Sequence, residues 1–218
     1  MSDFNIARKN MIQNQLMTNN ITENNILKAF DSIPREIFLS YKNRPKAYFD
    51  EDIEIVNNRY LIEPRIIGNI IKLSKIKKDH TVMDLACSSG YTSAILSKLS
   101  KKVYGIDNKK RLIEQAIINV EKLNITNIEF VNKNPINGMK KKFDIIFIFA
   151  GVQYIPSNLL DSLKNDGGSL ITVFYDNNYN GKIHIIKKIN GIISRNNFFT
   201  AQTPIISEFQ KLKKKFIF

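Results

Sequence analysis

The sequence predicts an α/β fold in which helices cover a doubly wound, mostly parallel sheet. From about residue 80 onward, short apolar runs alternate with segments of helical periodicity. The run 143–150 is apolar except for Asp144, which is typical of a strand buried on both faces. Such alternation of strands and helices favours a parallel sheet.

The expected elements follow one another along the chain in a βαβ order. Strands are expected at 81–85, 102–106, 128–132, 143–150 and 169–175, and helices at 93–99, 110–123 and 157–163. The stretches 182–188 and 207–218 are expected to add antiparallel edge strands.

The first third of the chain reads as a helical extension. Helices are expected over 4–17, then after Thr22 as N-cap until Pro34, and over 65–74 after Pro64. Residues 35–63 look irregular. We therefore expect a single domain over 1–218, with an extension over 1–79 and a ligand-binding core over 80–218.

Composition excludes several classes of protein. No apolar run is long enough to span a membrane, and the N-terminus lacks the pattern of a signal peptide, so a cytoplasmic protein without a membrane partner is expected. The single cysteine excludes an internal disulfide. The two histidines have no metal-ligand spacing, so no metal site is expected.

The formal charge of +13 raises the question of a nucleic-acid partner. The lysines are dispersed, however, and the runs 140–142 and 213–215 lack interleaved aromatic residues that would stack on bases. Heavy use of Lys, Asn and Ile is also what an AT-rich genome produces. A nucleic-acid partner is therefore not favoured.

A turn of small residues after the first expected strand carries the chemistry. Asp84 lies near the end of that strand, and the turn 86–90 leads into a helix with free N–H groups. Asp107 ends the second strand, 23 positions after Asp84, where a carboxylate accepts hydrogen bonds from ribose hydroxyls. This spacing suits both S-adenosylmethionine and a nicotinamide dinucleotide.

Two details favour S-adenosylmethionine as the cofactor. The fingerprint G-x-G-x-x-G is absent, because Ala86 and Ser88 stand at its first two glycine positions. Asp84 also suits a cationic methionine group better than a pyrophosphate. A nicotinamide dehydrogenase remains the weaker alternative.

Several motifs, in order, resemble those of the protein-L-isoaspartate O-methyltransferase family between about Asn10 and Tyr175. The matching segments are 11–16, 21–22, 33–38, 47–48, 82–85 with 89–91, 103–107, 143–146 and 166–168, and the closing 216–218 is similar to the family's last strand. The resemblance implies a Rossmann-type methyltransferase that uses S-adenosylmethionine and esterifies damaged aspartyl residues in a protein or peptide.

The resemblance also implies which residues contact the cofactor. They are Asp84, Ala86, Cys87, Ser88, Gly90, Tyr91, Asp107, Asn108 and Asn134. Asn134 stands where the family has an Asp-Gly pair against the adenine. Cys87 is at a helix N-terminus, where a thiol pKa can fall, but a small packing residue is the favoured interpretation.

The substrate loop departs from the family pattern Gln-Thr-Ile-Ser-x-Pro. Here the segment 59–64 reads Arg-Tyr-Leu-Ile-Glu-Pro, so Ile62 replaces the family's active-site serine. Of the glycines in the first cofactor motif, only Gly90 survives. The chain therefore resembles a divergent branch of the family, and no catalytic residue is assigned.

Three residues of this loop, Arg59, Tyr60 and Glu63, are candidates for a substrate cleft. Arg59 has the geometry to pair with a substrate carboxylate, but a solvated arginine or a partner of Glu63 is slightly favoured. Tyr60 would line the cleft or belong to the core. A carboxylate acceptor needs little acid–base help, because it is already a nucleophile at neutral pH.

Three functions remain open at this point. The first is isoaspartyl methyl transfer, and the second is methyl transfer to a different acceptor, which Ile62 and Arg59 suggest. The third is a catalytically degenerate binding domain, which the missing glycines suggest.

Overall fold

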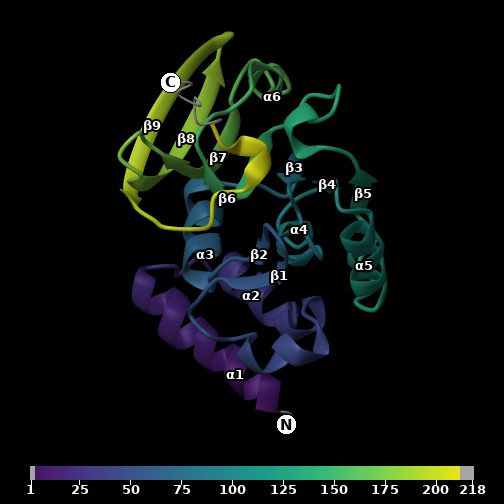
Figure 1. Cartoon of the computed structure of the whole chain (residues 1–218). Coiled ribbons are helices and arrows are strands. Elements are labelled where there is room, and N and C mark those ends of the chain that lie inside the picture. The colour runs from purple at the N-terminus through teal and green to yellow at the C-terminus, as the bar shows by residue number, and fades with distance from the viewer. Residues whose placement is uncertain (1–2, 212–218) are drawn as a thin grey trace, which may run out of the picture.

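The computed structural model describes residues 3–211 as one α/β unit (Figure 1). Within that range a seven-stranded sheet has the order β5-β4-β3-β6-β7-β8-β9. The strands from β5 to β7 are parallel, and β8 and β9 are antiparallel additions. Their bounds are β3 Thr81–Leu85, β4 Lys102–Asp107, β5 Ile128–Asn132, β6 Ile145–Val152, β7 Gly168–Tyr175, β8 Gly181–Ile189 and β9 Ile192–Thr200.

Helices precede or connect most of the parallel strands, as the alternating pattern predicts. They are α3 Pro64–Ser74, α4 Tyr91–Ser97, α5 Lys110–Glu121 and α6 Ser157–Asp161. All eight residues of β6 are buried, which confirms a central strand covered on both faces. In α5 the buried positions recur every three or four residues, because one face of the helix packs on the sheet.

The N-terminal segment is more broken than the sequence predicts. Instead of one helix over 4–17, α1 Asp3–Met11 passes into a π-helix, η1 Ile12–Leu16, and a 3-10 turn, η2 Met17–Asn19. Helix α2 Asn24–Ser32 begins after Glu23 without a side-chain cap, so Thr22 is not its N-cap. Figure 1 shows these elements, in purple and blue, gathered at one end of the molecule.

Residues 35–63 are not irregular throughout. They contain two 3-10 helices, η3 Arg35–Phe38 and η4 Tyr41–Lys46, and an antiparallel hairpin of β1 Ile53–Val56 and β2 Arg59–Leu61. The hairpin turns at Asn58, whose φ of 64° is left-handed. Each piece is too short to give a periodic signal, so sequence pattern alone missed it.

The C-terminal expectations are partly wrong. The stretch 182–188 is strand, but β8 lies inside the sheet, and the edge strand is β9. Every residue of β9 is exposed, so the strand lacks the alternation that marks a half-buried strand. Residues Ser207–Phe209 form a 3-10 helix, η6, instead of a strand, and the expected closing segment Phe216–Phe218 lies outside the described residues.

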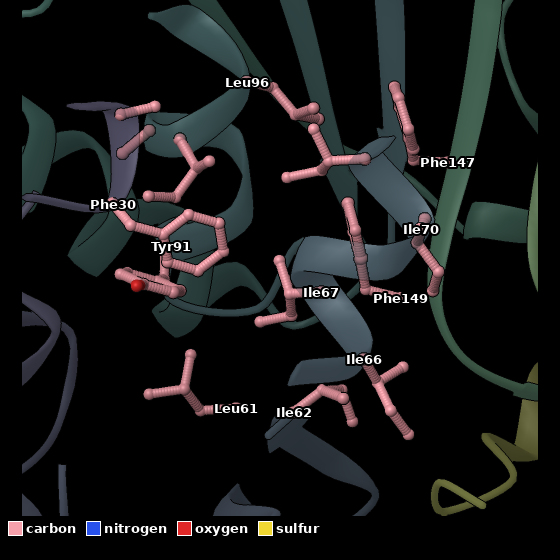
Figure 2. Packing of buried hydrophobic residues seen from close by; sticks show 14 of the residues in the cluster. Phe30, Leu61, Ile62, Ile66, Ile67, Ile70, Tyr91, Leu96, Phe147 and Phe149 are labelled. Atoms are coloured by element: carbon pink, nitrogen blue, oxygen red, sulfur yellow. The ribbon is translucent and has the colours of Figure 1, made fainter. Parts of the chain in front are cut away.

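The core fixes where the substrate-loop segment lies. Leu61 and Ile62 are buried in one apolar cluster with Ile66 and Ile67 of α3, Tyr91 of α4 and Phe149 of β6 (Figure 2). The loop is therefore packed against the sheet and does not project into solvent. Within residues 3–211, no helix is long and apolar enough to cross a membrane.

Strand order places the functional end of the sheet. Strand β3 pairs with β4 on one side and with β6 on the other. The order in which successive strands are added across the sheet therefore reverses at β3. Ligands of open α/β sheets bind beyond the carboxyl ends of the strands at such a switch point. Asp84 and Asp107 both lie there, near the ends of β3 and β4.

Candidate active site

The turn after β3 has the backbone of a glycine-rich loop, although most of its glycines are missing. Ala86, Ser88 and Gly90 have φ values of 58°, 54° and 90°, all in the left-handed region. A Cβ on Gly90 would lie 2.9 Å from the Cβ of Ala116, so this position needs glycine. At Ala86 and Ser88 a side chain occupies a conformation that glycine adopts without strain.

Asp84 is a buried acid with one free oxygen. The hydroxyls of Thr92 and Ser93 donate to its Oδ2 at 2.7 and 2.6 Å. Its Oδ1 is buried and accepts no hydrogen bond from any residue between 3 and 211. Burial raises the pKa of this carboxyl to about 7, although the two hydroxyls act to lower it.

Asp107 is fully buried and already accepts three hydrogen bonds from the protein. Its Oδ2 accepts from Nε of Arg59 at 2.8 Å and from the backbone N–H of Ser88 at 3.0 Å. Its Oδ1 accepts from the backbone N–H of Lys109 at 3.0 Å. The acid predicted to hold a ribose is therefore held by the protein itself.

Arg59 is the centre of this network. Besides Asp107, its guanidinium donates to Glu208 at 2.7 and 3.2 Å, to Oδ1 of Asn108 at 3.0 Å and to the carbonyl of Asn58 at 2.8 Å. These bonds use all five N–H donors of the side chain. Burial alone would lower the pKa of Arg59, but Glu208 and Asp107 outweigh it and raise the pKa.

This geometry overturns the favoured interpretation of Arg59. Its side chain is 1% exposed, so it is not a solvated loop residue. Glu63 is not its partner either, because Glu63 pairs with Arg65 at 2.7 Å. Tyr60, beside it in the chain, is half-buried.

Glu208 is a site residue that the sequence did not reveal. The two residues after strand β6 hold its segment in place. The N–H of Gln153 donates to the carbonyl of Phe209 at 2.8 Å, and the hydroxyl of Tyr154 donates to the carbonyl of Glu208 at 3.0 Å. Burial acts to raise the pKa of Glu208, but Arg59 lowers it to about 2. The two residues are 149 positions apart, and no local pattern links them.

The substrate-loop segment is fixed from behind by a second buried arginine. Arg35, which is fully buried, donates to the carbonyls of Ala47 at 2.6 Å and Ile62 at 2.8 Å. Its guanidinium also lies over the ring of Tyr91, 5.1 Å from the centroid. Tyr91 is therefore buried against the N-terminal elements.

The two loops meet in one small cavity. Tyr60, Leu61 and Ile62 line it from one side, and the turn residues 86–89 line it from the other. Its volume is about 10 Å³, which is room for one water molecule. The substrate-loop segment, residues 59–64, and the turn 86–90, here called the cofactor turn, thus face each other directly.

Two other predicted contacts behave differently. Burial raises the pKa of the Cys87 thiol well above its usual value, which excludes an activated thiolate and agrees with a packing residue. Asn134 is exposed and caps η5, Pro135–Asn137, by accepting from the N–H of Ile136 at 3.1 Å. It follows β5, whose end lies beside Asp107, since Asn132 donates to the carbonyl of Asp107 at 3.0 Å.

The residues suit an adenosyl cofactor in their chemistry. The free Oδ1 of Asp84 matches an ammonium group, and the turn 86–90 keeps the backbone path of a glycine-rich loop. At Asp107, the acid expected to bind the ribose, the carboxylate already accepts a hydrogen bond from Arg59. Cofactor pockets measure roughly 300–1,000 Å³, which is larger than the cavity of about 10 Å³ between the two loops.

Known proteins similar to this chain agree with the expected fold and family. A family model described as protein-L-isoaspartate(D-aspartate) O-methyltransferase matches residues 6–206. Protein-L-isoaspartate O-methyltransferase 2 of Shewanella sediminis is 34% identical over 167 residues, 76% of this chain and 68% of the relative. The protein of the same name in Geotalea uraniireducens is 26% identical over 197 residues, 89% of this chain and 90% of the relative.

Solved structures share the fold across most of the chain. One protein-L-isoaspartate O-methyltransferase has a TM-score of 0.80 at 22% identity and covers 93% of this chain and 67% of its own. A candidate enzyme of this type from Plasmodium falciparum, in complex with S-adenosyl-L-homocysteine, has a TM-score of 0.79 at 21% identity. The match covers 92% of this chain and 98% of the Plasmodium chain.

The family match extends beyond the motifs between Asn10 and Tyr175, and it includes the substrate loop with Glu63 and the turn 86–90. On this evidence the chain belongs to the protein-L-isoaspartate(D-aspartate) O-methyltransferase family of S-adenosylmethionine-dependent methyltransferases.

Proposed function

We propose that the protein esterifies the carboxylate of damaged aspartyl residues in polypeptides. The observation that carries this proposal is the single cavity in which residues 60–62 of the substrate-loop segment face residues 86–89 of the cofactor turn. An acceptor held by the first group would lie beside a methyl donor held by the second. The names of the relatives supply the substrate class.

The cofactor would be held by groups at the ends of three strands. Asp84 offers a free oxygen to its ammonium, Asp107 offers a carboxylate to its ribose once Arg59 has moved, and Asn134 offers an amide beside β5. The bound cofactor supplies a methyl group already activated by a sulfonium. Ala86, Cys87, Ser88, Gly90, Tyr91 and Asn108 complete the proposed contacts.

Methyl transfer to the acceptor requires alignment with the methyl donor and exclusion of water more than acid–base catalysis. A carboxylate is ionised at neutral pH, so no proton has to be removed before methyl transfer. Ile55, Leu61, Ile62 and Phe149 give the cavity an apolar wall that excludes water from the reacting pair. The absence of a hydroxyl at Ile62 is compatible with this mechanism.

The test compares two peptides that differ only in one linkage. An isoaspartyl peptide and its normal aspartyl counterpart are incubated with the enzyme and cofactor carrying a labelled methyl group. We expect base-labile label in the isoaspartyl peptide alone. Equal labelling of both peptides, or none at high enzyme concentration, contradicts the proposed substrate.

A different carboxylate acceptor is the second candidate, and Ile62 favours it. Its side chain is 2% exposed and packs in the core, so the usual serine position contributes no hydrogen bond to an acceptor. Labelled cofactor incubated with fractionated cell extract distinguishes this case. A labelled product outside the protein fraction supports it, and label in aged protein alone rejects it.

A further inference from the structure

A second, much larger cavity lies beside the cofactor turn. This groove has a volume of about 630 Å³ and runs between helix α5 and the N-terminal elements η3, η4 and β1. Its lining residues are Ile37, Phe38, Leu39, Ser40, Tyr41, Arg44, Ile55, Val56, Asn57, Ser89, Lys109, Arg111, Leu112, Gln115, Asn119 and Lys122. We call it the basic groove.

Cations line the basic groove on both sides. Arg44 belongs to η4, whereas Lys109, Arg111 and Lys122 follow α5 from one end to the other. No aspartate or glutamate among residues 3–211 lines it. Within the same range these four cations make no ion pair, and Nε of Arg44 is buried without a hydrogen-bond partner. Between residues 3 and 211, the positive charge of the groove thus has no carboxylate paired with it.

The floor and length of the groove suit an extended polypeptide. Buried Phe38, Leu39 and Leu112 give it an apolar floor. The lining of α5 extends from Leu112 to Lys122, a distance of about 15 Å at 1.5 Å per residue. An extended chain advances about 3.3 Å per residue, so four or five residues fit along the helix.

One end of the groove reaches the proposed reaction centre. Ser89 and Ile55 line both this groove and the small cavity between the two loops. Ser89 is held there because its hydroxyl donates to the carbonyl of Phe38 at 2.7 Å and Asn119 donates to its carbonyl at 3.1 Å. A chain lying in the groove would therefore continue directly to the cofactor turn.

We propose that the basic groove binds an acidic, extended segment of the polypeptide substrate next to the residue that is methylated. This inference rests on the proposed function and adds a preference for carboxylates flanking the acceptor. Charge complementarity identifies the occupant as acidic, and the aliphatic floor favours a peptide. A nucleic-acid strand would need aromatic faces for its bases, and of the groove's two aromatic residues Phe38 is buried.

Peptide binding tests the groove without requiring methyl transfer. The probe is a fluorescein-labelled pentapeptide that alternates glutamate with leucine and valine, and the reference probe has lysine in place of glutamate. Anisotropy is measured with the wild type, with the double variant Arg44→Glu/Lys122→Glu, and with Lys77→Glu/Lys101→Glu. The last pair makes the same change of charge at exposed lysines remote from the groove.

We expect the wild type and the remote variant to bind the acidic probe and to ignore the basic one. The groove variant should bind at least about tenfold more weakly, because each reversed charge turns an attraction into a repulsion. Binding should also weaken as salt rises. In methyl transfer, the groove variant should raise KM for an acidic isoaspartyl peptide and leave kcat and the KM of a neutral one unchanged.

Each outcome separates this inference from the proposed function. Equal loss in both double variants, or stronger binding of a single-stranded oligonucleotide than of the acidic peptide, overturns the peptide groove. Peptide binding that depends on Arg44 and Lys122, together with no ester on any isoaspartyl peptide, leaves the groove in place and rejects the proposed function. Ester formation with equal KM for acidic and neutral peptides rejects the groove alone.

Discussion

Nε of Arg59 lies 2.8 Å from Oδ2 of Asp107, and the two side chains are 1% and 0% exposed. Asp107 is the acid expected to receive the ribose of the cofactor. If Asp107 holds the ribose as proposed, Arg59 and the cofactor would compete for one carboxylate, and cofactor binding would depend on the fraction of molecules in which Arg59 has moved away. Glu208 helps to hold Arg59 in the closed position.

The first prediction is that Glu208→Gln strengthens cofactor binding. Hydrogen bonds to a charged partner contribute about 1.5–3 kcal/mol, so their weakening should release Arg59 more often. We expect the affinity for S-adenosylhomocysteine to rise by roughly tenfold, because apparent affinity scales with the open fraction. Isothermal titration calorimetry measures it, and Glu121→Gln, at an exposed position of α5, is the matched control.

A fall in affinity for Glu208→Gln would contradict competition. That result would mean that Arg59 and Glu208 assist the bound cofactor. No binding by any of the three proteins would remove the basis of the enzyme proposal as well.

The second prediction concerns stability in acid. Arg59 lowers the folded-state pKa of Glu208 to about 2 against the opposing effect of burial, whereas the carboxyl has its ordinary pKa of 4.5 when unfolded. Between these values the unfolded chain binds more protons, so unfolding becomes easier as pH falls. We expect Glu208→Gln to be less stable than wild type at pH 6 and to approach it below pH 3. A constant difference in urea unfolding across that range would count against the ion pair.

The third prediction concerns Asp84, whose effect on the pH dependence of stability has the opposite sign to that of Glu208. Burial raises its folded-state pKa from 3.8 to about 7, so the native state holds the proton more tightly over this range. Ionisation then costs stability that grows as pH rises from about 4 to 7, up to about 4 kcal/mol at 1.36 kcal/mol per pH unit. Relative to wild type, Asp84→Asn should gain stability between pH 4 and pH 8 and lose affinity for S-adenosylhomocysteine. A pH-independent difference in unfolding free energy would refute the buried titration.

The sheet and the cofactor turn were predictable because their signals are local. Strands 81–85 and 128–132 have the predicted bounds, and the ends of the other parallel strands differ by no more than two residues. The apolar run within 143–150 predicts a buried strand. The spacing of Asp84 and Asp107 predicts that both lie at one edge of the sheet, since the carboxyl ends of parallel strands meet there. The positive φ values at Ala86 and Ser88 also follow the family's glycine positions.

The partners of Arg59 were not predictable from the sequence. Its contacts with Asp107 and Glu208 span 48 and 149 positions, and an arginine on a short strand has no pattern that reveals such contacts. A strand was expected from Ser207 onward, whereas the residues form the 3-10 helix η6, which positions Glu208 at the site. The basic groove likewise combines residues of α5 with η3 and η4, two helices too short to produce a periodic signal.

The last prediction is that Ser88→Gly stabilises the protein. Ser88 has a φ of 54°, which costs a non-glycine residue about 1–2 kcal/mol, and its buried hydroxyl has no hydrogen-bond partner among residues 3–211. Glycine removes both costs and keeps the N–H that donates to Asp107, while its own flexibility offsets about 0.5–1 kcal/mol. We expect a net gain of about 1–2 kcal/mol, seen as a Tm increase of about 2–8 °C for a domain of this size. Ser97→Gly in α4, where the serine is helical and hydrogen-bonded, should instead destabilise by about 1 kcal/mol or more. Equal losses for the two variants would show that the turn tolerates a side chain at Ser88 without strain.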